Sequence, residues 1–270
     1  MIVLLRGGGD LATGVAVRLL RAGLKVIVTE LPQPLAVRRS VSFAQAVYSG
    51  EVTVEEFLAR RVADATDTLR VLQILAKNQV PVLVDPSGES ALALHPTVIV
   101  DARLTKRPPE PLKHQAKLYL GLGPGFTAGE NCHAVVETNR GHRLGRVIWQ
   151  GTAAADTGIP ESVSGQQEKR VIRAPADGVL VGHAEIGMHL ETGPLIASIG
   201  DVQVCAPFSG MLRGLLYPGL EVHAGQKIGD LDPRDDVSLI GLISDKALAV
   251  GGGVLEAILS RSELRPLLWK

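Results

Sequence analysis

The stretch IVLLRGGGDLATG, residues 2–14, decides the fold of the first half of the chain. Four apolar residues run directly into Arg6 and three glycines, and residues 15–21 then carry apolar side chains at helical spacing. A second apolar run, residues 26–28, follows and leads to Glu30. A buried strand, a glycine turn, a helix and a second buried strand in this order predict a βαβ unit with a parallel sheet.

Two further pairs of helix and strand extend this sheet. The segments 66–77 and 86–94 are predicted as helices, and each leads into an apolar strand that ends at an acidic residue, Asp85 or Asp101. Parallel sheets bind ligands outside the carboxyl ends of their strands. We therefore expect the glycine turn, Glu30, Asp85 and Asp101 to surround one crevice.

The spacing Gly7-x-Gly9-x-x-Ala12 fits the fingerprint of dinucleotide-binding proteins. Its glycines permit a tight turn and let a pyrophosphate approach the backbone N–H groups at the start of a helix. An acid at the end of the second strand commonly holds ribose hydroxyls, and Glu30 has that place. The predicted cofactor-binding residues of this segment are Gly7, Gly8, Gly9, Asp10, Ala12, Glu30, Arg38 and Arg39. A structural turn that binds no nucleotide, with a solvated arginine pair, is the alternative.

Residues 121–129, GLGPGFTAG, form a second glycine-rich loop, in which Gly121, Gly123 and Gly125 are the predicted ligand-binding positions. Small residues at this density let a ligand approach closely or form a nest of N–H groups for a phosphate or an oxyanion. The loop lacks the Gly-Lys-Ser/Thr ending of a Walker loop, so ATP hydrolysis by that mechanism is not expected. A tight surface connection is the alternative.

One short segment gathers the candidate catalytic groups, which are Cys132, His133, Glu137 and His142. If residues 134–137 form a strand, His133 and Glu137 share one face, and a turn at 139–141 brings His142 back toward them. Such a set can hold a metal or a soft chalcogen species. No metal ligand is predicted, because the paired spacing of zinc motifs is missing, and a structural hairpin is the alternative.

The second half of the chain is predicted to be an all-β module, because short apolar pairs alternate there with Gly and Pro. It also repeats itself at an offset of 32 residues. Ala174, Pro175, Gly178, Leu180, Gly182, Gly187, Gly193 and Ile196 recur as Ala206, Pro207, Gly210, Leu212, Gly214, Gly219, Gly225 and Ile228. The pattern resembles the two halves of biotinyl and lipoyl carrier domains. Residues 199–202, at the joining hairpin, contain no lysine, so no covalent biotin or lipoate is expected.

Together these patterns predict an α/β fold class: a Rossmann-like parallel sheet domain, an all-β barrel-sandwich hybrid (biotinyl/lipoyl-like) module and a C-terminal helical tail. The expected parts are a nucleotide-binding domain over residues 1–168, the barrel over residues 169–233, and a segment over residues 234–270 that packs back on the first domain.

The composition limits the classes of partner. Lys and Arg number 28, as do Asp and Glu, so no net charge is available to collect nucleic acid or an anionic membrane surface. We expect no transmembrane helix, because the apolar runs fall short of the roughly 18–20 residues of a span, and the N-terminal run is interpreted as a strand rather than a signal peptide. Two cysteines, Cys132 and Cys205, favour a reducing compartment, so a cytoplasmic location is expected.

Several segments together resemble the YqeB-type family of selenium-dependent molybdenum hydroxylase system proteins. They are residues 5–14, 34–43, 121–129, 137–142, and 243–246 with 251–257. The resemblance implies an accessory role in the maturation of molybdenum hydroxylases that carry labile selenium, with a molybdenum hydroxylase as protein partner. It implies NAD(P) or another nucleotide, or a molybdopterin dinucleotide, as ligand, and it makes Cys132 the candidate thiolate for handling sulfur or selenium.

Three hypotheses about function follow. The first is a cytoplasmic accessory protein that binds a nucleotide or a nucleotide-bearing molybdenum cofactor. The second is an NAD(P)-dependent oxidoreductase that uses the same crevice, with His133, Glu137 and His142 as the available acid and base groups. The third is a non-catalytic scaffold that docks partners through its barrel. Whether the protein catalyses a reaction stays open.

Overall fold

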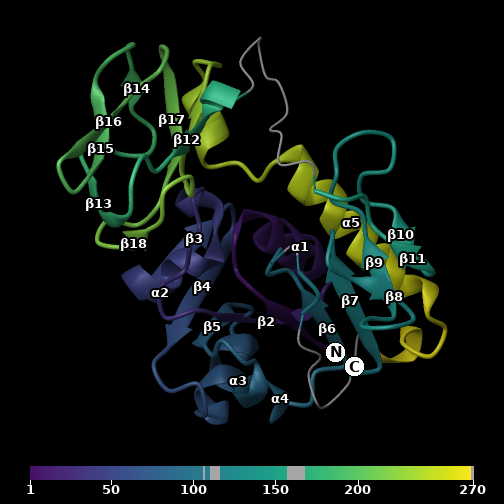
Figure 1. Ribbon diagram of the computed structural model, residues 1–270. Coiled ribbons are helices and arrows are strands. Elements are labelled where there is room, and N and C mark those ends of the chain that lie inside the picture. Colours follow the sequence, from purple (N-terminus) through teal and green to yellow (C-terminus); the bar gives the residue numbers. More distant parts are fainter. Residues whose placement is uncertain (106, 110–115, 157–167, 269–270) are drawn as a thin grey trace. The chain divides into compact units, whose positions relative to one another are not determined.

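The computed structural model describes residues 1–105, 107–109, 116–156 and 168–268, and it divides the chain into two compact units (Figure 1). Unit 1 comprises Met1–Pro34, Ser42–Asp156 and Ile243–Lys270, and unit 2 comprises Leu35–Val41 and Thr157–Leu242. The predicted boundaries lie after residues 168 and 233, whereas the units divide after residues 156 and 242, and the short segment 35–41 belongs to unit 2.

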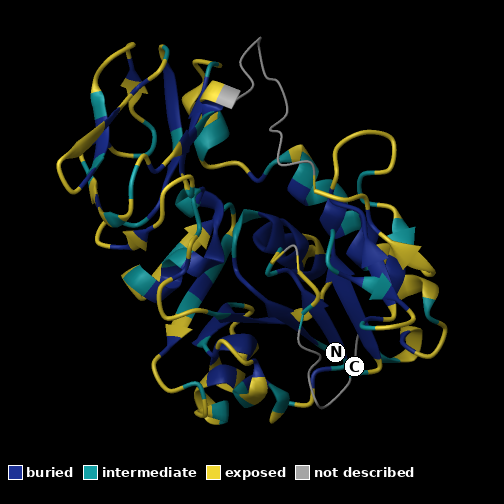
Figure 2. Cartoon of the chain, viewed as in Figure 1, coloured by how far each residue is buried: buried dark blue, intermediate teal, exposed yellow. Residues whose placement is uncertain are grey.

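Unit 1 is built on a mixed sheet of nine strands. In spatial order the strands are β10 (Val147–Ile148), β9 (Ala134–Val136), β7 (Leu118–Leu122), β6 (Val98–Asp101), β1 (Ile2–Arg6), β2 (Lys25–Glu30), β5 (Val80–Val84), β4 (Phe57–Val62) and β3 (Glu51–Val54). Neighbours from β9 to β4 are parallel, and the edge strands β10 and β3 are antiparallel to theirs. The short strands β8 (Thr127–Ala128) and β11 (Gly151–Thr152) pair separately. The central strands are almost wholly buried (Figure 2).

Helices cover this sheet. On one face, α3 (Thr68–Ala76) and α4 (Glu89–Leu92) pack against a core that includes Leu4, Ile27, Leu83 and Ile99. Asp67 caps α3 by accepting a hydrogen bond from the backbone N–H of Arg70. The remaining helical segments of unit 1 are α1 (Asp10–Arg21), η2 (Phe43–Gln45), α2 (Ala46–Ser49), α5 (Asp245–Ser260) and η5 (Arg265–Leu267).

Helices α1 and α5 lie side by side and touch through glycines (Figure 1). A Cβ at Gly14 of α1 would come within 2.5 Å of the Cβ of Ala247, and one at Gly251 of α5 would lie 2.8 Å from the carbonyl oxygen of Gly14. Helix α5 also lies against β7, β9 and β10. Helix α5 is therefore an integral layer of unit 1.

One apolar stretch is longer than expected, since all apolar runs were predicted to fall short of a membrane span. The segment Val237–Ser260 is long and apolar enough to cross a membrane by length and composition. In the structure it contains η4 (Val237–Ile240) and α5. Helix α5 buries a face that includes Val250, Val254 and Ile258, and the core helix of a soluble protein passes the same test of length and composition.

Unit 2 consists of two four-stranded sheets. The first has the order β12 (Val171–Arg173), β19 (Lys227–Asp232), β17 (Gly210–Leu215), β14 (His189–Leu190). The second has the order β16 (Val202–Cys205), β15 (Leu195–Ile199), β13 (Gly178–Gly182), β18 (Glu221–Val222). The unit also includes η1 (Arg39–Val41), η3 (Glu168–Arg170) and η4. Its aliphatic core includes Leu180, Ile196, Leu212 and Ile228, which are four of the repeated positions.

The predicted fold class is therefore corrected. The structure is mixed α/β with several sheets, and it is not a parallel Rossmann-like domain joined to a biotinyl/lipoyl-like barrel with a helical tail. The apolar runs of the central strands, which are parallel, led to the prediction of a parallel sheet, and that prediction was extended to all strands. It missed the hairpin of β3 and β4 and the return of β10 because these strands are short and only partly buried.

Candidate functional site

The glycine turn between β1 and α1 is the best defined feature at the carboxyl edge of the sheet. Gly7 has a φ of +94°, and its N–H donates to the carbonyl oxygen of Thr29 over 2.8 Å. Gly9 is the N-cap of α1, with φ −64° and no side-chain cap, and a Cβ placed there would meet nothing within 4 Å. Asp10 opens the helix, and Ala12 is buried in its first turn. The approach to the first N–H groups of α1 is therefore open at Gly9.

Glu30, the predicted ribose ligand, closes part of this turn. Its two carboxylate oxygens accept hydrogen bonds from the N–H groups of Gly8, over 2.9 Å, and Leu31, over 2.7 Å. Burial raises the pKa of Glu30 above its ordinary value, although these two hydrogen bonds lower it in part. A ligand that used the N–H of Gly8 would have to displace this carboxylate.

Residues 42–45 of unit 1 form the wall beside Gly8. The N–H of Ala44 donates to the carbonyl oxygen of Gly8 over 2.8 Å, and the N–H of Phe43 donates to the hydroxyl of Thr13 over 2.9 Å. A Cβ at Gly8 would lie 2.9 Å from Val28 and 3.0 Å from the nitrogen of Ala44. Gly8 is thus required by the chain's own packing, whereas Gly9 faces open space.

A buried ionic network lies at the carboxyl ends of β1 and β6 and includes Tyr119 of β7. Asp101 is 1% exposed and accepts from Arg103 at 2.7 Å and from the hydroxyl of Tyr119 at 2.9 Å. Arg6, directly before the glycine turn, lies 3.4 Å from the same carboxylate and donates to the carbonyl oxygen of Ser87 over 3.0 Å. Burial, followed by the charge of Asp101, raises the pKa of Tyr119, so this hydroxyl stays protonated. The Nε of Arg6 is buried without a hydrogen-bond partner.

Asp85, at the end of β5, fixes the start of α4. Its carboxylate accepts from the hydroxyl of Ser87 and from the N–H groups of Gly88 and Ser90, each over 2.9 Å. Both carboxylate oxygens of Asp85 therefore accept hydrogen bonds from its own loop and the start of α4.

Neighbouring atoms of unit 1 leave no room for a side chain at the glycines of the second loop. A Cβ at Gly121 would overlap the ring of Phe126, and one at Gly123 would lie 2.5 Å from the hydroxyl of Thr138. Gly125 has a φ of +101°, and a Cβ there would lie 2.6 Å from the carbonyl oxygen of Arg107. The N–H of Gly123 already donates to Val136. Gly121 is paired with Asp101 across β7 and β6, which places the loop next to the ionic network.

The four candidate catalytic residues have separate surroundings. Glu137 is 2% exposed, and its oxygens accept from the N–H groups of Asn139 and Ala154 over 2.7 and 2.8 Å. The Nδ1 of His133 accepts from the N–H of Tyr119 over 2.9 Å, and His142 is exposed. Among the described residues, no group of three or more His, Cys, Asp or Glu side chains is arranged to hold a metal ion.

Cys132 is a buried thiol. It is 8% exposed, and burial raises its pKa to about 11, which a hydrogen bond from the backbone of Gly121 lowers only in part. Because the thiolate is the reactive form, the Cys132 side chain is a poor nucleophile at neutral pH in this conformation.

Alkylation of the two cysteines with iodoacetamide should therefore be unequal. At pH 7.5 we expect Cys205, which is exposed, to react first, while Cys132 reacts about 100-fold more slowly than an ordinary thiol because its thiolate fraction is smaller. Peptide mass spectrometry of the wild type and of Cys205→Ser gives the two rates, and the rate at Cys132 should keep rising up to about pH 11. Labelling of Cys132 at neutral pH as fast as that of Cys205 would contradict the burial argument.

The predicted pair Arg38 and Arg39 belongs to unit 2, whereas the glycine turn belongs to unit 1. Arg38 donates to the carbonyl oxygen of Leu242 over 3.2 Å. Arg39 donates to the carbonyl oxygen of Leu215 over 2.7 Å, and its guanidinium lies 5.4 Å from the ring centre of Tyr217. Within unit 2 both side chains bind the polypeptide itself.

The sequence analysis missed Arg6, Arg103 and Tyr119. One signal was present: Arg6 interrupts an apolar strand immediately before the glycines, and a buried cation there requires a buried anion. Asp101 was expected at the crevice, but its partners come from positions that spacing along the chain does not connect.

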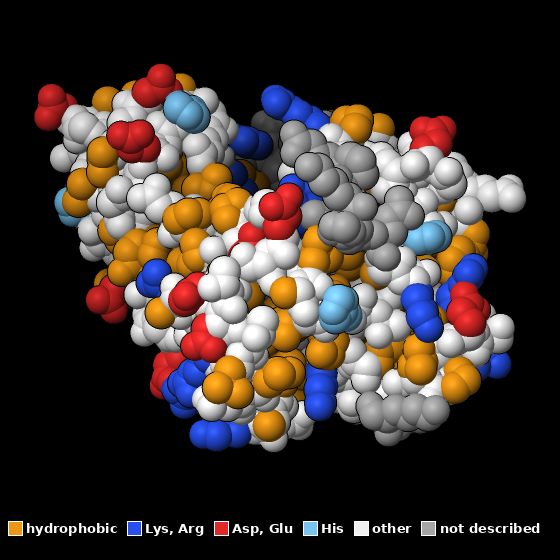
Figure 3. Space-filling view, turned by 90° about the horizontal axis from the view of Figure 1, so that it is seen from below, with side chains coloured by type: hydrophobic (Ala, Val, Ile, Leu, Met, Phe, Trp, Pro, Cys, Tyr) orange, Lys and Arg blue, Asp and Glu red, His pale blue; other side chains and the backbone are white. Residues whose placement is uncertain are grey.

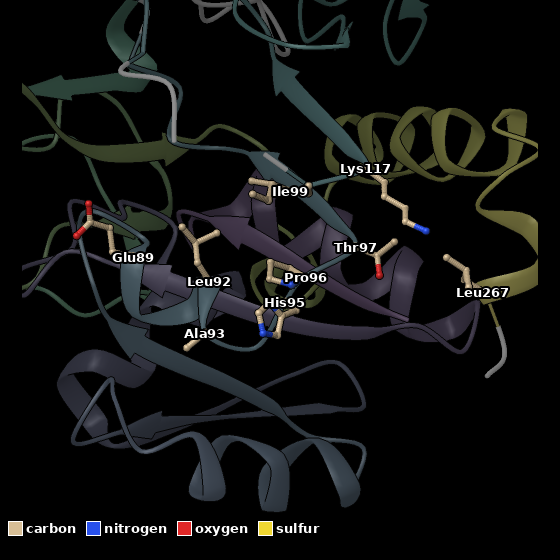
Figure 4. A pocket seen from close by; sticks show the side chains of 10 residues that line it. Glu89, Leu92, Ala93, His95, Pro96, Thr97, Ile99, Lys117 and Leu267 are labelled. Atoms are coloured by element: carbon tan, nitrogen blue, oxygen red, sulfur yellow. The ribbon is translucent and has the colours of Figure 1, made fainter. Parts of the chain in front are cut away.

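A cavity of about 740 Å³ lies elsewhere in unit 1 (Figure 4). Leu92, Pro96 and Ile99 contribute apolar surface, and His95 and Lys117 add polar groups. Thr97 and Lys117, which also line the cavity, directly precede β6 and β7, so this cavity lies at the amino ends of these strands, opposite the glycine turn. On the face drawn in Figure 3, cationic and anionic side chains lie among one another, so an anion depends on local donors for binding.

Fold and site together define a class: a mixed α/β protein in which a glycine turn opens onto the start of a 12-residue helix beside a buried ionic network. The sequence supports a YqeB-type family for the chain, since it is 46% identical over 258 residues to the uncharacterized protein YqeB of Escherichia coli (strain K12). The match covers 96% of this chain, and the chain spans 47% of the length of that relative. No family model matches the chain.

Similar solved structures include proteins of the succinylglutamate desuccinylase and aspartoacylase type. An aspartoacylase family protein from Mesorhizobium loti aligns over 87% of this chain and 86% of its own, with 9% identity and a TM-score of 0.29. The ectoine utilization protein EutE from Ruegeria pomeroyi aligns over 85% and 84%, with 12% identity and a TM-score of 0.26.

Proposed function

We propose that this protein is an accessory factor in the maturation of a selenium-dependent molybdenum hydroxylase, and that it binds a nucleotide or a nucleotide-bearing molybdenum cofactor at the glycine turn of unit 1. The link to the hydroxylase is supported by the resemblance of the five segments described above. The class of ligand is supported by the geometry of the turn.

The observation that carries the proposal is the open backbone at Gly9. The first N–H groups of a helix have no partners within the helix, and together with the helix dipole they attract an anion such as a phosphate group. Gly9 leaves space in front of these groups, while Gly7 turns the chain and Gly8 packs against residues 42–45. When bound, a dinucleotide would bring its pyrophosphate to this position. The chain would supply backbone N–H groups as hydrogen-bond donors, and the carboxyl edge of the sheet beside Asp101 would border the ligand.

An NAD(P)-dependent oxidoreductase is the competing interpretation of the same turn. Hydride transfer requires an acid or base that is positioned beside the nicotinamide. The carboxylate of Glu137 accepts hydrogen bonds from two backbone N–H groups. The Nδ1 of His133 accepts a hydrogen bond from the backbone N–H of Tyr119. These side chains do not form the acid and base set that the oxidoreductase hypothesis requires, so the accessory role is the stronger proposal.

Replacing Gly9 tests the site. Gly9→Val should fold, because its φ of −64° suits any residue and its Cβ meets no neighbour, but the side chain should block the approach of phosphate. We expect the Kd of the bound nucleotide to rise at least about 100-fold, or ~2.7 kcal/mol. Isothermal titration with NAD, NADP, ATP and molybdopterin dinucleotide measures this. Gly241→Val is the matched control, since Gly241 also has a negative φ and open space around it.

The possible outcomes separate the hypotheses. Selective binding of molybdopterin dinucleotide that Gly9→Val abolishes and Gly241→Val retains supports the accessory role. Selective binding of NAD or NADP promotes the oxidoreductase. If none of the four compounds binds the wild type, or if Gly9→Val binds as well as the control, the ligand site has been placed wrongly and the scaffold hypothesis gains.

A further inference from the structure

The cavity of about 740 Å³ in unit 1 has no part in the proposed function, although it has the size of a small-molecule site. Sites for small organic ligands are concave, largely apolar and about 300–1,000 Å³ in volume. All ten residues drawn around the cavity in Figure 4 belong to the described part of unit 1. The cavity lies at the amino ends of β6 and β7, whereas the glycine turn lies at the carboxyl edge of the same sheet.

Apolar side chains form the middle of the cavity wall. Leu92 of α4, Pro96 and Ile99 of β6 lie between the two ends of the cavity in Figure 4. Leu267 of η5 adds a further apolar side chain. A hydrocarbon chain that packs against this wall leaves water, and the gain in free energy grows with the apolar area that is removed from water.

The charged groups of the cavity are divided between its ends. The ammonium of Lys117 and the hydroxyl of Thr97 lie at one end, and the carboxylate of Glu89 lies at the other (Figure 4). Within the described part of the chain, the side chains of Lys117 and Thr97 have no hydrogen-bond or ion-pair partner. One end of the cavity therefore offers a positive charge and a hydroxyl donor to a ligand, and the other end presents a negative charge.

His95, which also lines the cavity, has a strained backbone. Its φ is +49°, a left-handed conformation that costs free energy for a residue other than glycine, and a residue before a proline prefers an extended backbone. The N–H of His95 donates to the carbonyl oxygen of Leu92 over 2.9 Å, so the turn that holds this strain is part of the cavity wall. Strained residues of this kind cluster at ligand sites.

We propose that this cavity binds a monocarboxylic acid with an apolar chain, of the medium-chain fatty acid class, and that Lys117 and Thr97 bind its carboxylate. The chain lies along the apolar wall between the two ends. One ammonium and one hydroxyl suit a single negative charge, whereas Glu89 at the far end opposes a second one. A dicarboxylic acid of the same length is therefore disfavoured.

Isothermal titration of the full chain with sodium octanoate tests the proposal. We expect hexanoate, octanoate and decanoate to bind with increasing affinity, by about two- to fourfold for each added methylene, because each methylene buries further apolar surface. Octanedioate should bind at least about 10-fold more weakly than octanoate, since its second carboxylate would lose water beside Glu89. The proposal fails if octanoate does not bind, or if octanedioate binds as tightly as octanoate.

Substitutions at one end of the cavity test where the carboxylate binds. Lys117→Met keeps the length of the side chain and removes its charge, so the Kd for octanoate should rise at least about 10-fold, while the Kd for uncharged octanol should not rise. Thr97→Val removes only the hydroxyl and should raise the Kd for octanoate about 3- to 10-fold. Lys77→Met is the matched control, because Lys77 follows α3, is exposed and does not line the cavity.

The control should bind octanoate as the wild type does. Equal effects of Lys117→Met and Lys77→Met, or an equal loss of octanoate and octanol binding in Lys117→Met, would show that Lys117 does not bind a carboxylate. Gly9→Val should bind octanoate as tightly as the wild type, because the glycine turn is at the other end of the strands. The failure of either site is thus distinguishable from the failure of the other.

Discussion

Asp101→Asn is expected to destabilise unit 1 by about 3–5 kcal/mol, because it removes the negative charge that compensates buried Arg6. The side chain of Arg6 is 4% exposed, and the carboxylate of Asp101 also binds Arg103 and Tyr119. An amide can keep the hydrogen bond from Tyr119 but leaves the cation uncompensated. Urea unfolding followed by tryptophan fluorescence measures the effect on unit 1, since unit 2 contains no tryptophan.

Two variants make this expectation specific. Glu130→Gln removes one negative charge from an exposed position of unit 1 and should change the free energy of unfolding by less than about 0.5 kcal/mol. Arg6→Met combined with Asp101→Asn should recover a large part of the loss, because the uncompensated cation is then gone. A loss equal to that of Glu130→Gln, or a double variant no more stable than Asp101→Asn, would show that the Arg6 charge does not depend on Asp101.

Gly253→Ala should be the other strongly destabilising substitution, at about 2–3 kcal/mol. A Cβ at Gly253 would overlap the carbonyl oxygen of Gly145 and would lie 2.8 Å from Val136, so α5 would have to move away from the sheet. The backbone oxygen cannot turn aside as the end of a flexible side chain can. Urea unfolding again reports the free energy of unit 1.

The adjacent Gly252 provides the matched control. It lies in the same turn of α5, and a Cβ there would meet nothing within 4 Å. Gly252→Ala should therefore stabilise unit 1 by about 0.5–1 kcal/mol, which is the usual gain in a helix interior. Equal effects of the two substitutions, in either direction, would mean that α5 does not approach the sheet as closely as described.

The local elements around the first glycines could be predicted from the sequence. The apolar runs 2–5 and 26–28 lie in β1 and β2, and the helical spacing of residues 15–21 lies in α1. Asp85 and Asp101 do lie at the ends of β5 and β6. Such patterns are readable because a buried parallel strand is continuously apolar and a glycine turn marks its end.

The edges of the sheet and the partners within the site could not be predicted in this way. Strand β10 has only two residues, and β3 is largely exposed, so neither shows the apolar run of a central strand. The contacts of Arg6 with Asp101 and Ser87 join positions more than 80 residues apart. Glu30 was placed correctly at the end of β2, but the direction of its carboxylate, back onto Gly8, depends on the final fold.

The two copies of the 32-residue repeat are interlocked in unit 2. The middle strand of each copy crosses to the other copy's sheet: β14 pairs with β17, and β18 pairs with β13. Neither copy can therefore complete its own sheet. A chain with a single copy would have to associate with a second copy around a two-fold axis, as in a domain-swapped dimer. In unit 2 the second copy takes the place of that partner, and side chains of both copies form one core.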